Sequence, residues 1–304
     1  MPTDPDYPFI KEQLETGQVI PFLGSAASLV VDSPDSGGLP VPPSASDLAR
    51  ALAINTDLPE GEPIELATVA QYLKGVGGSG PLYKKLRAIF NRDYTATSLH
   101  KYLAQVASQV PLLVVTTNYD DILETAFGEV EHDVVTHICD RKLGDRVFWK
   151  KHRLVEGEWV DSEPEKVIPN KLNIDLNKTS AIYKMHGAVD KQSSSRDQYV
   201  IAEDDYIDFL TRMTRNKAIP AVFSEIFKSR HFLFLGYGLK DWNLRVVLNR
   251  IQDNIRGTSE FSSWAIQYRP SLLEYRFWIK RDVEVFDVDL KDFVRNLKSA
   301  GPRG

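Results

Sequence analysis

The sequence contains almost no cysteine: Cys139 is the only one among 304 residues. A single thiol cannot form a disulfide within the chain, and it excludes a zinc site that needs two or more cysteines. The sequence also lacks any apolar run near the roughly 20 residues that cross a bilayer, and residues 1–7 lack the basic start and apolar stretch of a signal peptide. We therefore expect a cytoplasmic protein with no membrane partner.

Basic residues show no excess either. The chain has 37 Lys and Arg against 42 Asp and Glu, a formal net charge of -5. Surfaces that bind nucleic acid usually carry a basic stripe, so direct nucleic-acid binding is not expected. Segment 141–153 is the best candidate for a local basic patch, and a solvated loop explains it more simply. Hydrophobic residues make up 42% of the chain, enough for the core of one large domain over 1–304.

Six short apolar runs have the composition of buried strands. The runs are Val19–Leu23, Leu112–Val115, Ala181–Met185, His231–Leu235, Trp264–Gln267 and Val283–Phe286. Such near-continuous runs suit parallel strands that are covered on both faces. Helical patterns lie between them, at 46–53, 63–73, 81–90, 99–107, 121–127, 221–228 and 241–254. The alternation predicts an α/β fold with a Rossmann-like parallel six-stranded sheet and helices on both faces.

Two stretches depart from this alternation. A loop rich in Pro, Gly and Ser at 32–43, followed by a helical module at about 45–108, separates the first two strands. The segment at about 129–180 is polar and irregular, with only short β-like pieces. We interpret it as a small inserted subdomain.

The first strand ends in the small residues Gly24, Ser25, Ala26 and Ser28. Small residues at this place let the backbone approach a pyrophosphate, whose charge the N–H groups of the following turn can bind. The run does not match Gly-x-Gly-x-x-Gly, and a tight turn that binds nothing explains it equally well.

The second strand delivers Thr116, Thr117, Asn118 and Asp120 to its end. An amide and a carboxylate are thereby aimed at the crevice where open α/β sheets bind ligands. Capping of the next helix by Asn118 or Asp120 would explain one of these residues but not all of them. We therefore favour a ligand site.

His186 follows the third strand and precedes Gly187. A histidine at a sheet end, with close backbone beside it, suits acid–base chemistry near neutral pH. The alternative is a histidine satisfied within the core or at the surface. His132 and His137 have no convincing third ligand near them in sequence, so no metal site is predicted.

The fourth strand ends in Gly236, Tyr237 and Gly238. Two glycines at a strand end permit a strained turn and the close approach of a ligand. Asp241 follows, and contact with a ligand and capping of the helix at 241–254 are equally good interpretations of it.

Taken in this order, the four motifs resemble the sirtuin-like superfamily, and most closely its bacterial antiphage-defence branch, whose members cleave NAD. The resemblance runs from about Val19 to Val285. Thr-Thr-Asn-Tyr-Asp at 116–120 stands in place of the sirtuin Thr-Gln-Asn-Ile-Asp, and Lys-Met-His-Gly at 184–187 matches the strand that carries the catalytic histidine. Residues 24–28 match the phosphate loop, 37–44 resemble the flexible cofactor loop, and 199–206 resemble a segment common in the defence branch.

The resemblance implies a NAD hydrolase that cleaves the nicotinamide–ribose bond, with NAD as its substrate and no metal. It implies that Asn118 holds the attacking water and the ribose, that His186 is the general base, and that Asp120 binds the nicotinamide carboxamide. Gly24, Ser25, Ala26 and Ser28 would bind the pyrophosphate. The remaining expected cofactor contacts are Thr116, Thr117, Gly236, Tyr237 and Asp241.

Two departures from the family pattern qualify this hypothesis. Ala26 stands where the usual Gly-Ala-Gly loop has its second glycine, and its methyl group could crowd the phosphates or forbid a positive φ. This keeps open a non-catalytic sensor of NAD or ADP-ribose. The four-cysteine zinc module of protein deacylases is absent, which shifts the expectation from deacylation to hydrolysis and leaves a zinc-free deacylase as a further alternative.

An uncontrolled NAD hydrolase would kill its own cell. The hypothesis therefore includes an inactive resting state, released by homo-oligomer assembly or by a partner, in abortive infection by NAD depletion. Suitable partners are an ATPase of the same system, an Argonaute-like module or a phage protein. Nothing in the sequence selects among them.

Overall fold

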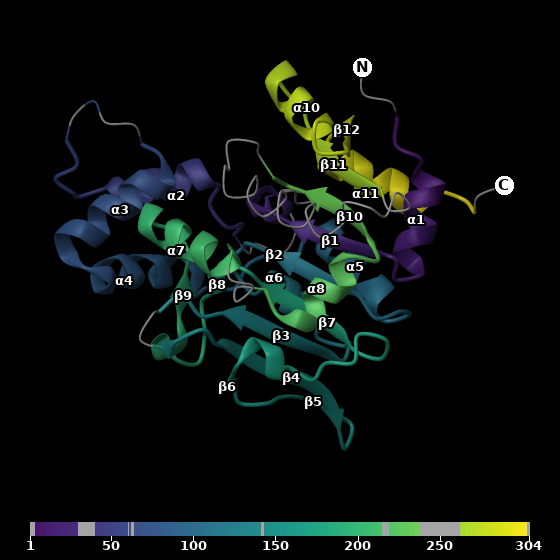
Figure 1. Cartoon of the computed structure of the whole chain (residues 1–304), viewed down its shortest axis with the longest axis horizontal. Coiled ribbons are helices and arrows are strands. Elements are labelled where there is room, and N and C mark those ends of the chain that lie inside the picture. The colour runs from purple at the N-terminus through teal and green to yellow at the C-terminus, as the bar shows by residue number, and fades with distance from the viewer. Residues whose placement is uncertain are drawn as a thin grey trace.

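The six apolar runs of the sequence form parallel strands of one sheet in the computed structural model (Figure 1). They are β1 (Val19–Leu23), β2 (Leu113–Thr116), β7 (Ser180–Lys184), β10 (His231–Leu235), β11 (Ser263–Gln267) and β12 (Val283–Asp287). The structure describes residues 4–29, 40–59, 61, 64–140, 143–214, 219–237 and 262–302. The predicted α/β class, with a mainly parallel sheet of the Rossmann-like kind, is confirmed.

The order of the strands creates a topological switch point in the middle of the sheet. The order is β12-β11-β10-β1-β2-β7-β3-β4-β5, so the chain leaves β1 toward β2 and later returns to β10 on the other side of β1. Leu23 of β1 is level with Leu235 of β10, and both strands therefore end at the same edge. Ligands of open α/β sheets bind at such a point, outside the carboxyl ends of the strands.

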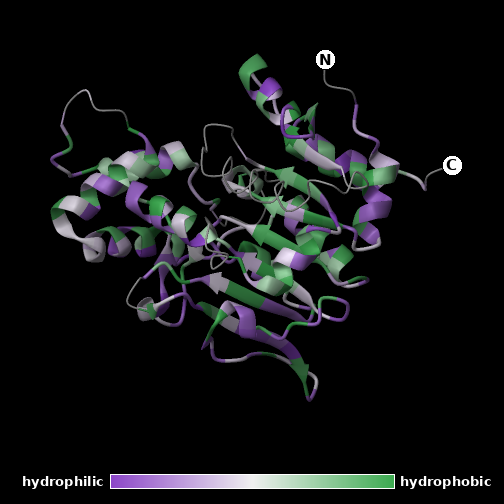
Figure 2. Cartoon of the chain, in the orientation of Figure 1, coloured by the Kyte–Doolittle hydropathy of each residue, from purple (hydrophilic) through white to green (hydrophobic). Residues whose placement is uncertain are grey.

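The sheet is larger than the predicted six strands because segment 129–180 continues it. β3 (His132–His137) pairs parallel with β7, and β4 (Val147–Val155) pairs antiparallel with β3. β5 (Glu158–Asp161) and β6 (Glu165–Val167) pair antiparallel with β4, which brings the sheet to ten strands in the described part of the chain. These strands carry many polar side chains, and the hairpin of β4 and β5 is hydrophilic along much of its length (Figure 2). The sequence therefore indicated only short β-like pieces of β3 and β4, and not their pairing with the main sheet.

Helices cover both faces of the parallel strands, as predicted. On one face lie α1 (Tyr7–Glu15), α5 (Ser98–Ala107), α6 (Ile122–Ala126) and α11 (Leu290–Ser299). On the other face lie α7 (Glu203–Thr214), α8 (Ala221–Phe227) and α10 (Leu272–Ile279). Each face of the sheet has its own hydrophobic core, and successive side chains of β1 point to opposite faces. Val19 and Leu23 pack in the core under α1, α5, α6 and α11, and Ile20 and Phe22 pack in the core under α7, α8 and α10.

Four of these helices, α1, α7, α10 and α11, were not predicted from the sequence, and the predicted helix at 241–254 lies outside the described residues. The missed helices α1 and α11 lie beside each other near the two ends of the chain (Figure 1), where Lys11 Nζ donates to the main-chain oxygen of Ala300 at 2.8 Å. Among the described helices, none is long and apolar enough to cross a membrane.

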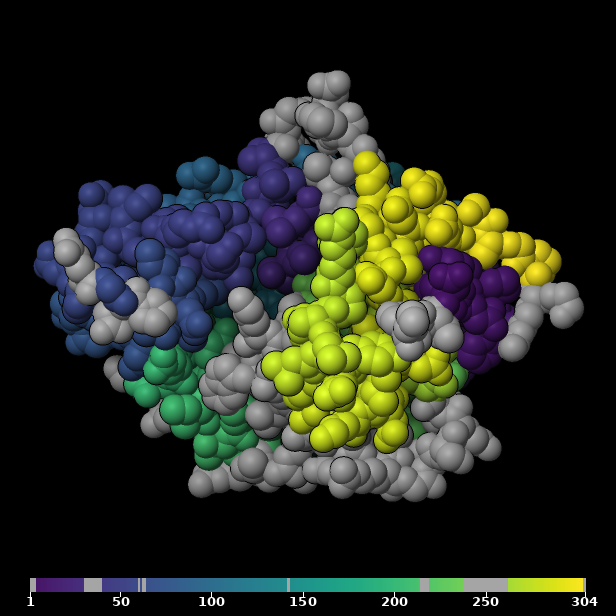
Figure 3. All heavy atoms as spheres, turned by 90° about the horizontal axis from the view of Figure 1, so that it is seen from above, coloured from purple at the N-terminus to yellow at the C-terminus, as the bar shows by residue number. Residues whose placement is uncertain are grey.

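A third core lies beside the sheet, in a layer formed by α2 (Ala45–Ala53), α3 (Leu66–Gly77) and α4 (Ser79–Phe90). These helices pack on the segments that follow β2 and β7, through Tyr119, Ile122 and Tyr199. Seen from above, they occupy one side of the molecule and the C-terminal segment occupies the other (Figure 3). The layer thus adjoins the edge at which the predicted site residues lie.

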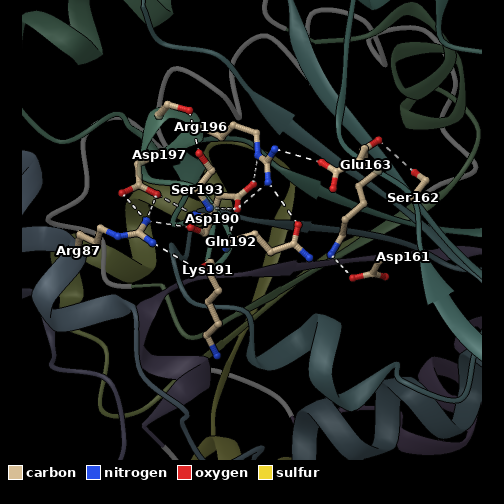
Figure 4. A network of polar contacts seen from close by, with 12 residues as sticks. Arg87, Asp161, Ser162, Glu163, Asp190, Lys191, Gln192, Ser193, Arg196 and Asp197 are labelled. Atoms are coloured by element: carbon tan, nitrogen blue, oxygen red, sulfur yellow. Dashed lines mark hydrogen bonds and ion pairs between the residues drawn. The ribbon is translucent and has the colours of Figure 1, made fainter.

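Arg87 of α4 fastens this helical layer to the segment that follows β8 (Gly187–Ala188) (Figure 4). Its Nη1 donates to the two carboxylate oxygens of Asp197 at 2.8 and 3.0 Å, and to the main-chain oxygen of Asp190 at 2.8 Å. Asp197 is only 4% exposed. A carboxylate that water does not reach depends on such a cation for its charge.

We predict that Arg87→Met lowers the free energy of unfolding by about 2–3 kcal/mol, because the buried Asp197 carboxylate loses its cation. Arg50→Met is the matched control, since Arg50 pairs with Asp47 at 2.7 Å on an exposed helix surface. That change should cost less than about 0.5 kcal/mol. Urea unfolding of both variants measures the difference, and equal costs would contradict the role given to Arg87.

Candidate active site

A cavity of about 220 Å³ lies at the carboxyl ends of β1, β2, β7 and β10. All four sequence motifs contribute to its walls. The predicted site residues that line it are Ser25, Thr117, Asn118, Asp120, His186, Gly236 and Tyr237. The predicted residues that lie behind this lining are Gly24, Ala26, Ser28 and Thr116. Asp241 lies outside the described residues.

The loops after β1 and β10 touch each other through two glycines. Gly24 N donates to the main-chain oxygen of Leu235 at 2.9 Å, and Ala26 N donates to that of Gly236 at 3.1 Å. A Cβ atom on Gly236 would lie 2.3 Å from Ala27 N, and one on Gly24 would lie 2.5 Å from the oxygen of Gly236. Gly236 also has a φ of +75°. Both positions therefore require glycine for the contact between the loops, whatever ligand they bind.

The phosphate-loop candidate is a short 3₁₀ helix over Ser25–Ser28. Ala26 is not among the described residues with positive φ, so its backbone does not need the conformational freedom of glycine. Ala26 N and Ala27 N donate to protein carbonyl oxygens, whereas the side chain of Ser25 is exposed at the cavity wall. The conformational objection to Ala26 therefore does not apply to this loop.

Asn118 ties the ends of β1 and β2 together. Its Nδ2 donates to the main-chain oxygen of Gly24 at 3.2 Å and to Ser28 Oγ at 3.0 Å. Its main-chain N donates to Thr116 Oγ1 at 3.0 Å, and Thr116 Oγ1 in turn donates to the oxygen of Leu23 at 3.1 Å. These bonds fix the Asn118 side chain in the cavity wall.

Helix capping does not account for Asn118. Helix α6 begins at Ile122 with Asp121 at its N-cap position, and that residue forms no side-chain cap bond. Asp120 contributes one such contact, because its Oδ1 accepts a hydrogen bond from Ile122 N at 3.2 Å. The capping alternative therefore explains part of what Asp120 does and nothing of what Asn118 does.

Asp120 is a buried carboxyl group in the cavity wall, only 5% exposed. Burial raises its pKa to about 6, and the positive charge of Lys184 opposes that rise. Lys184 Nζ donates to the main-chain oxygen of Asp120. Asp120 is therefore ionised above about pH 6, which gives the cavity a negative charge at physiological pH.

His186 is also buried, and its ring meets the rings of Tyr206 and Phe209 edge-on, with centroids 5.5 and 5.4 Å away. Burial lowers the pKa of His186 to about 3, so the imidazole is neutral at pH 7. Its Nε2 has no hydrogen-bond partner in the described part of the protein. The imidazole thus has an unpaired nitrogen and lies in the wall of the cavity, so it is available to form a hydrogen bond with a ligand or a water molecule, although the same burial makes it a weak base.

The sequence identified only part of the apolar wall of the cavity, because the segments 37–44, 116–120 and 199–206 contribute to it but the helices α2–α4 were not recognised as part of a site. This wall consists of Pro42, Pro43, Ala45, Leu48, Leu66, Phe90, Tyr119 and Tyr206. Most of these residues belong to the helical layer α2–α4 or to the chain that enters it, where an amphipathic pattern indicates core packing but not a ligand. In the described ranges, no group of three or more His, Cys, Asp or Glu could hold a metal ion.

We predict that Gly236→Ala destabilises the protein by about 3 kcal/mol or more, because the methyl group adds a backbone clash to the cost of a positive φ. Gly144→Ala is the matched control. Gly144 has a φ of +70° but nothing within 4 Å of its Cβ position, so only the conformational cost of about 1 kcal/mol should appear. Thermal and urea unfolding measure both variants, and similar losses would show that the loop contact is unimportant.

A second prediction concerns the cost of the buried Asp120 carboxylate. The folded protein keeps the Asp120 proton up to about pH 6, whereas the unfolded chain releases it near pH 3.8. The stability due to this protonated carboxyl is complete below pH 3.8 and is lost as the pH rises through 6. Asp120→Asn is neutral at every pH. The difference in unfolding free energy between this variant and the parent should therefore shift in favour of the variant by about 2–3 kcal/mol as the pH rises from 4 to 8. A constant difference in unfolding free energy across this range would be the contrary result.

Three curated proteins similar to this chain are named after NAD hydrolysis or defence. NAD(+) hydrolase ThsA of Bacillus cereus (strain MSX-D12) is 26% identical over 297 residues, 96% of this chain and 52% of the relative. NAD(+) hydrolase ThsA of Acinetobacter baumannii (strain 532279) is 27% identical over 207 residues, 68% of this chain and 35% of the relative. Defense-associated sirtuin 2 of Bacillus subtilis is 24% identical over 267 residues, 87% of this chain and 22% of the relative.

The chain thus spans about half the length, or less, of these curated relatives. The family comparison is independent of that length. Residues 112–286 match the SIR2-like domain, and this match covers more than half of the chain and includes the motifs of Asn118, His186 and Gly236. The sirtuin-like resemblance of the sequence is confirmed, and the chain belongs to the family of SIR2-like domain proteins.

Proposed function

We propose that this protein hydrolyses NAD at the bond between nicotinamide and ribose, releasing nicotinamide and ADP-ribose. The observation that carries the proposal is the buried, neutral imidazole of His186, whose Nε2 has no partner, in the same cavity wall as Asn118 and Asp120. The names of the ThsA relatives as NAD(+) hydrolases support the choice of substrate.

The reaction needs positioning and a dry site more than a strong nucleophile. Nicotinamide leaves as a neutral pyridine, and positive charge develops on the ribose in the transition state. Asn118, fixed by its bonds to Gly24 and Ser28, would position the ribose and the attacking water. His186 is neutral at pH 7 and would take the proton from that water or from a ribose hydroxyl as positive charge on the ribose makes the proton acidic.

Asp120 would bind the nicotinamide leaving group. Its carboxylate is ionised above about pH 6 and accepts hydrogen bonds, so it suits the N–H donors of the nicotinamide carboxamide. The same negative charge also favours the positive charge that develops on the ribose. In this proposal the acid limb of the activity follows the Asp120 carboxyl, and His186 stays neutral throughout that range.

The pyrophosphate would lie over the loop 24–28, where Ser25 presents an exposed side chain beside Gly24, Ala26 and Ser28. Thr117 and Tyr237 would complete the cleft, and their hydroxyl groups lie 3.2 Å apart. The roles of Thr116 and Gly236 would be to hold the strand ends in place. The contact assigned to Asp241 also remains a proposal.

We further propose that NAD depletion by this enzyme serves cytoplasmic antiphage defence by abortive infection. The name of the Bacillus subtilis relative, a defence-associated sirtuin, supports this setting. Because unrestrained hydrolysis would kill the cell, the resting protein would be inactive until it forms a homo-oligomer or meets an activator. Candidate activators are an ATPase of the same system, an Argonaute-like module and a phage protein.

The proposal is tested by measuring nicotinamide release from NAD, alone and with candidate activators, over a range of protein concentrations. His186→Ala and Asn118→Ala should each reduce the rate by about 100- to 10,000-fold, because each removes a group that acts on the reacting atoms. His231→Ala is the matched control: it is another buried histidine of the same sheet, at the start of β10, away from the cavity. Its rate should equal that of the parent.

Other outcomes would identify a different function. Full activity of His186→Ala would overturn the mechanism. Binding of NAD or ADP-ribose without turnover under every condition would favour the sensor alternative, which the Ala26 departure raised. Formation of O-acyl-ADP-ribose from an acyl-lysine peptide would favour a zinc-free deacylase, whereas ADP-ribose is the expected product.

A further inference from the structure

Lys184 is a buried charge that the proposed reaction does not use. It lies on β7, two residues before His186, and its side chain is 1% exposed. Its Nζ donates to the main-chain oxygen of Asp120 and to Glu124 Oε1, the latter at 2.8 Å. Burying a lysine is costly, so such a residue needs firm partners. Here Asp120 lies in the turn that follows β2, and Glu124 lies in α6.

Lys184 lies outside the cavity of the proposed active site, so it can affect the reaction only through Asp120. Asp120 lines the cavity of the proposed active site, whereas Lys184 and Glu124 line a second, larger cavity of about 370 Å³. The lining of this second cavity also includes Asp190 and Arg196, which appear in Figure 4. Lys184 thus reaches Asp120 from behind and is not part of the lining of the first cavity.

We propose that Lys184 is a positioning residue for NAD cleavage: it fixes the turn that carries Asp120 and stabilises the ionised Asp120 carboxylate across the wall between the two cavities. The inference rests on the proposed function and deepens it. Glu124 contributes to this positioning, because it holds the Lys184 ammonium in place on the side away from the active site.

The charges around Asp120 explain why Lys184 favours the ionised form of its carboxyl group. Burial raises the pKa of Asp120 to about 6, the positive charge of Lys184 lowers it, and the negative charges of Glu124 and Asp121 raise it further. Asp121 is itself paired with Lys191 at 2.7 Å, which weakens its influence. Ile122 N donates to the Asp120 carboxylate and favours its ionised form.

The remaining titratable neighbours have smaller effects on this balance. Tyr94 interacts electrostatically with Asp120, and its own pKa is raised mainly by burial, so it is neutral at physiological pH. His186 lines the same cavity and is neutral there. Lys184 and Glu124 are therefore opposite charges acting on Asp120 from two elements, β7 and α6, and removing each should shift the Asp120 titration in opposite directions.

A purely structural role for Lys184 gives a different expectation. Loss of either partner of a buried ion pair would then lower stability, and with it activity, at every pH. It would not move the pH at which Asp120 ionises upward in one variant and downward in the other. The sign of the two shifts therefore separates the positioning role from the structural role.

The experiment uses the full chain with Lys184→Met, Glu124→Gln and a control, Lys150→Met. Lys150 lines the second cavity but pairs with Asp161 at 2.8 Å, away from Asp120. Nicotinamide release is measured from pH 5 to 9, and the carboxyl carbons of ¹³C-labelled aspartate are titrated by NMR, with Asp120→Asn for assignment. Lys184→Met should move the Asp120 titration and the acid limb of kcat up by about one pH unit, and Glu124→Gln should move both down.

Each outcome decides a separate point. If the parent releases no nicotinamide with any activator, the proposed function fails, while the NMR titration still tests the effect of Lys184 on Asp120. Unchanged Asp120 titration, or shifts of the same sign in Lys184→Met and Glu124→Gln, would overturn the inference. A shift in Lys150→Met equal to that in Lys184→Met would do the same. If Lys184→Met does not fold, the direction of the Glu124→Gln shift decides.

Discussion

The contact between the backbones of Gly24 and Gly236 is the constraint on which the site depends. β1 and β10 run parallel up to Leu23 and Leu235, and beyond them the two loops touch with no room for a side chain. This contact places the 3₁₀ helix at the end of β1, and the two acceptors that hold Asn118 are Ser28 Oγ in that helix and the main-chain oxygen of Gly24 just before it. The geometry at the end of β2 therefore depends on two glycines from motifs more than 200 residues apart in sequence.

The charge state of the cavity follows from burial. The same loss of hydration keeps His186 neutral and raises the pKa of Asp120 toward the physiological range. Burial of Asp120 therefore costs stability above about pH 3.8, and burial of His186 costs stability only below about pH 6.5, because these are the ranges in which the unfolded chain carries the charge. Pairs of groups whose environments push their charge states apart are a common arrangement for acid–base chemistry. Here Lys184, behind the cavity wall, limits how far the pKa of Asp120 rises, whereas the negative charge of Glu124 raises that pKa.

The helical layer α2–α4 gives this site its apolar side. Leu48, Leu66 and Phe90 face the cavity from three helices, so the polar strand ends meet a hydrophobic wall that helps to exclude water. Arg87 links the layer to Asp197, in the segment that follows the His186 strand. The cavity is thus built from two parts of the chain, and the strength of their connection bears directly on its shape.

Local sequence determined the six central strands, the three helices of the layer α2–α4, three of the seven described helices that cover the sheet, and the small and polar residues at four strand ends. The reason is that periodicity and turn chemistry are properties of neighbouring residues. Local sequence could not give the strand order, the continuation of the sheet through β3–β6, or the part of the apolar wall that α2–α4 supply, since these depend on pairing and packing between distant segments. The sequence marked Asn118 and His186 as candidates. Only the tertiary structure showed that Asn118 is no helix cap, that His186 is neutral, and that Lys184 supports Asp120 from behind, because burial and charge contacts are set by the folded chain.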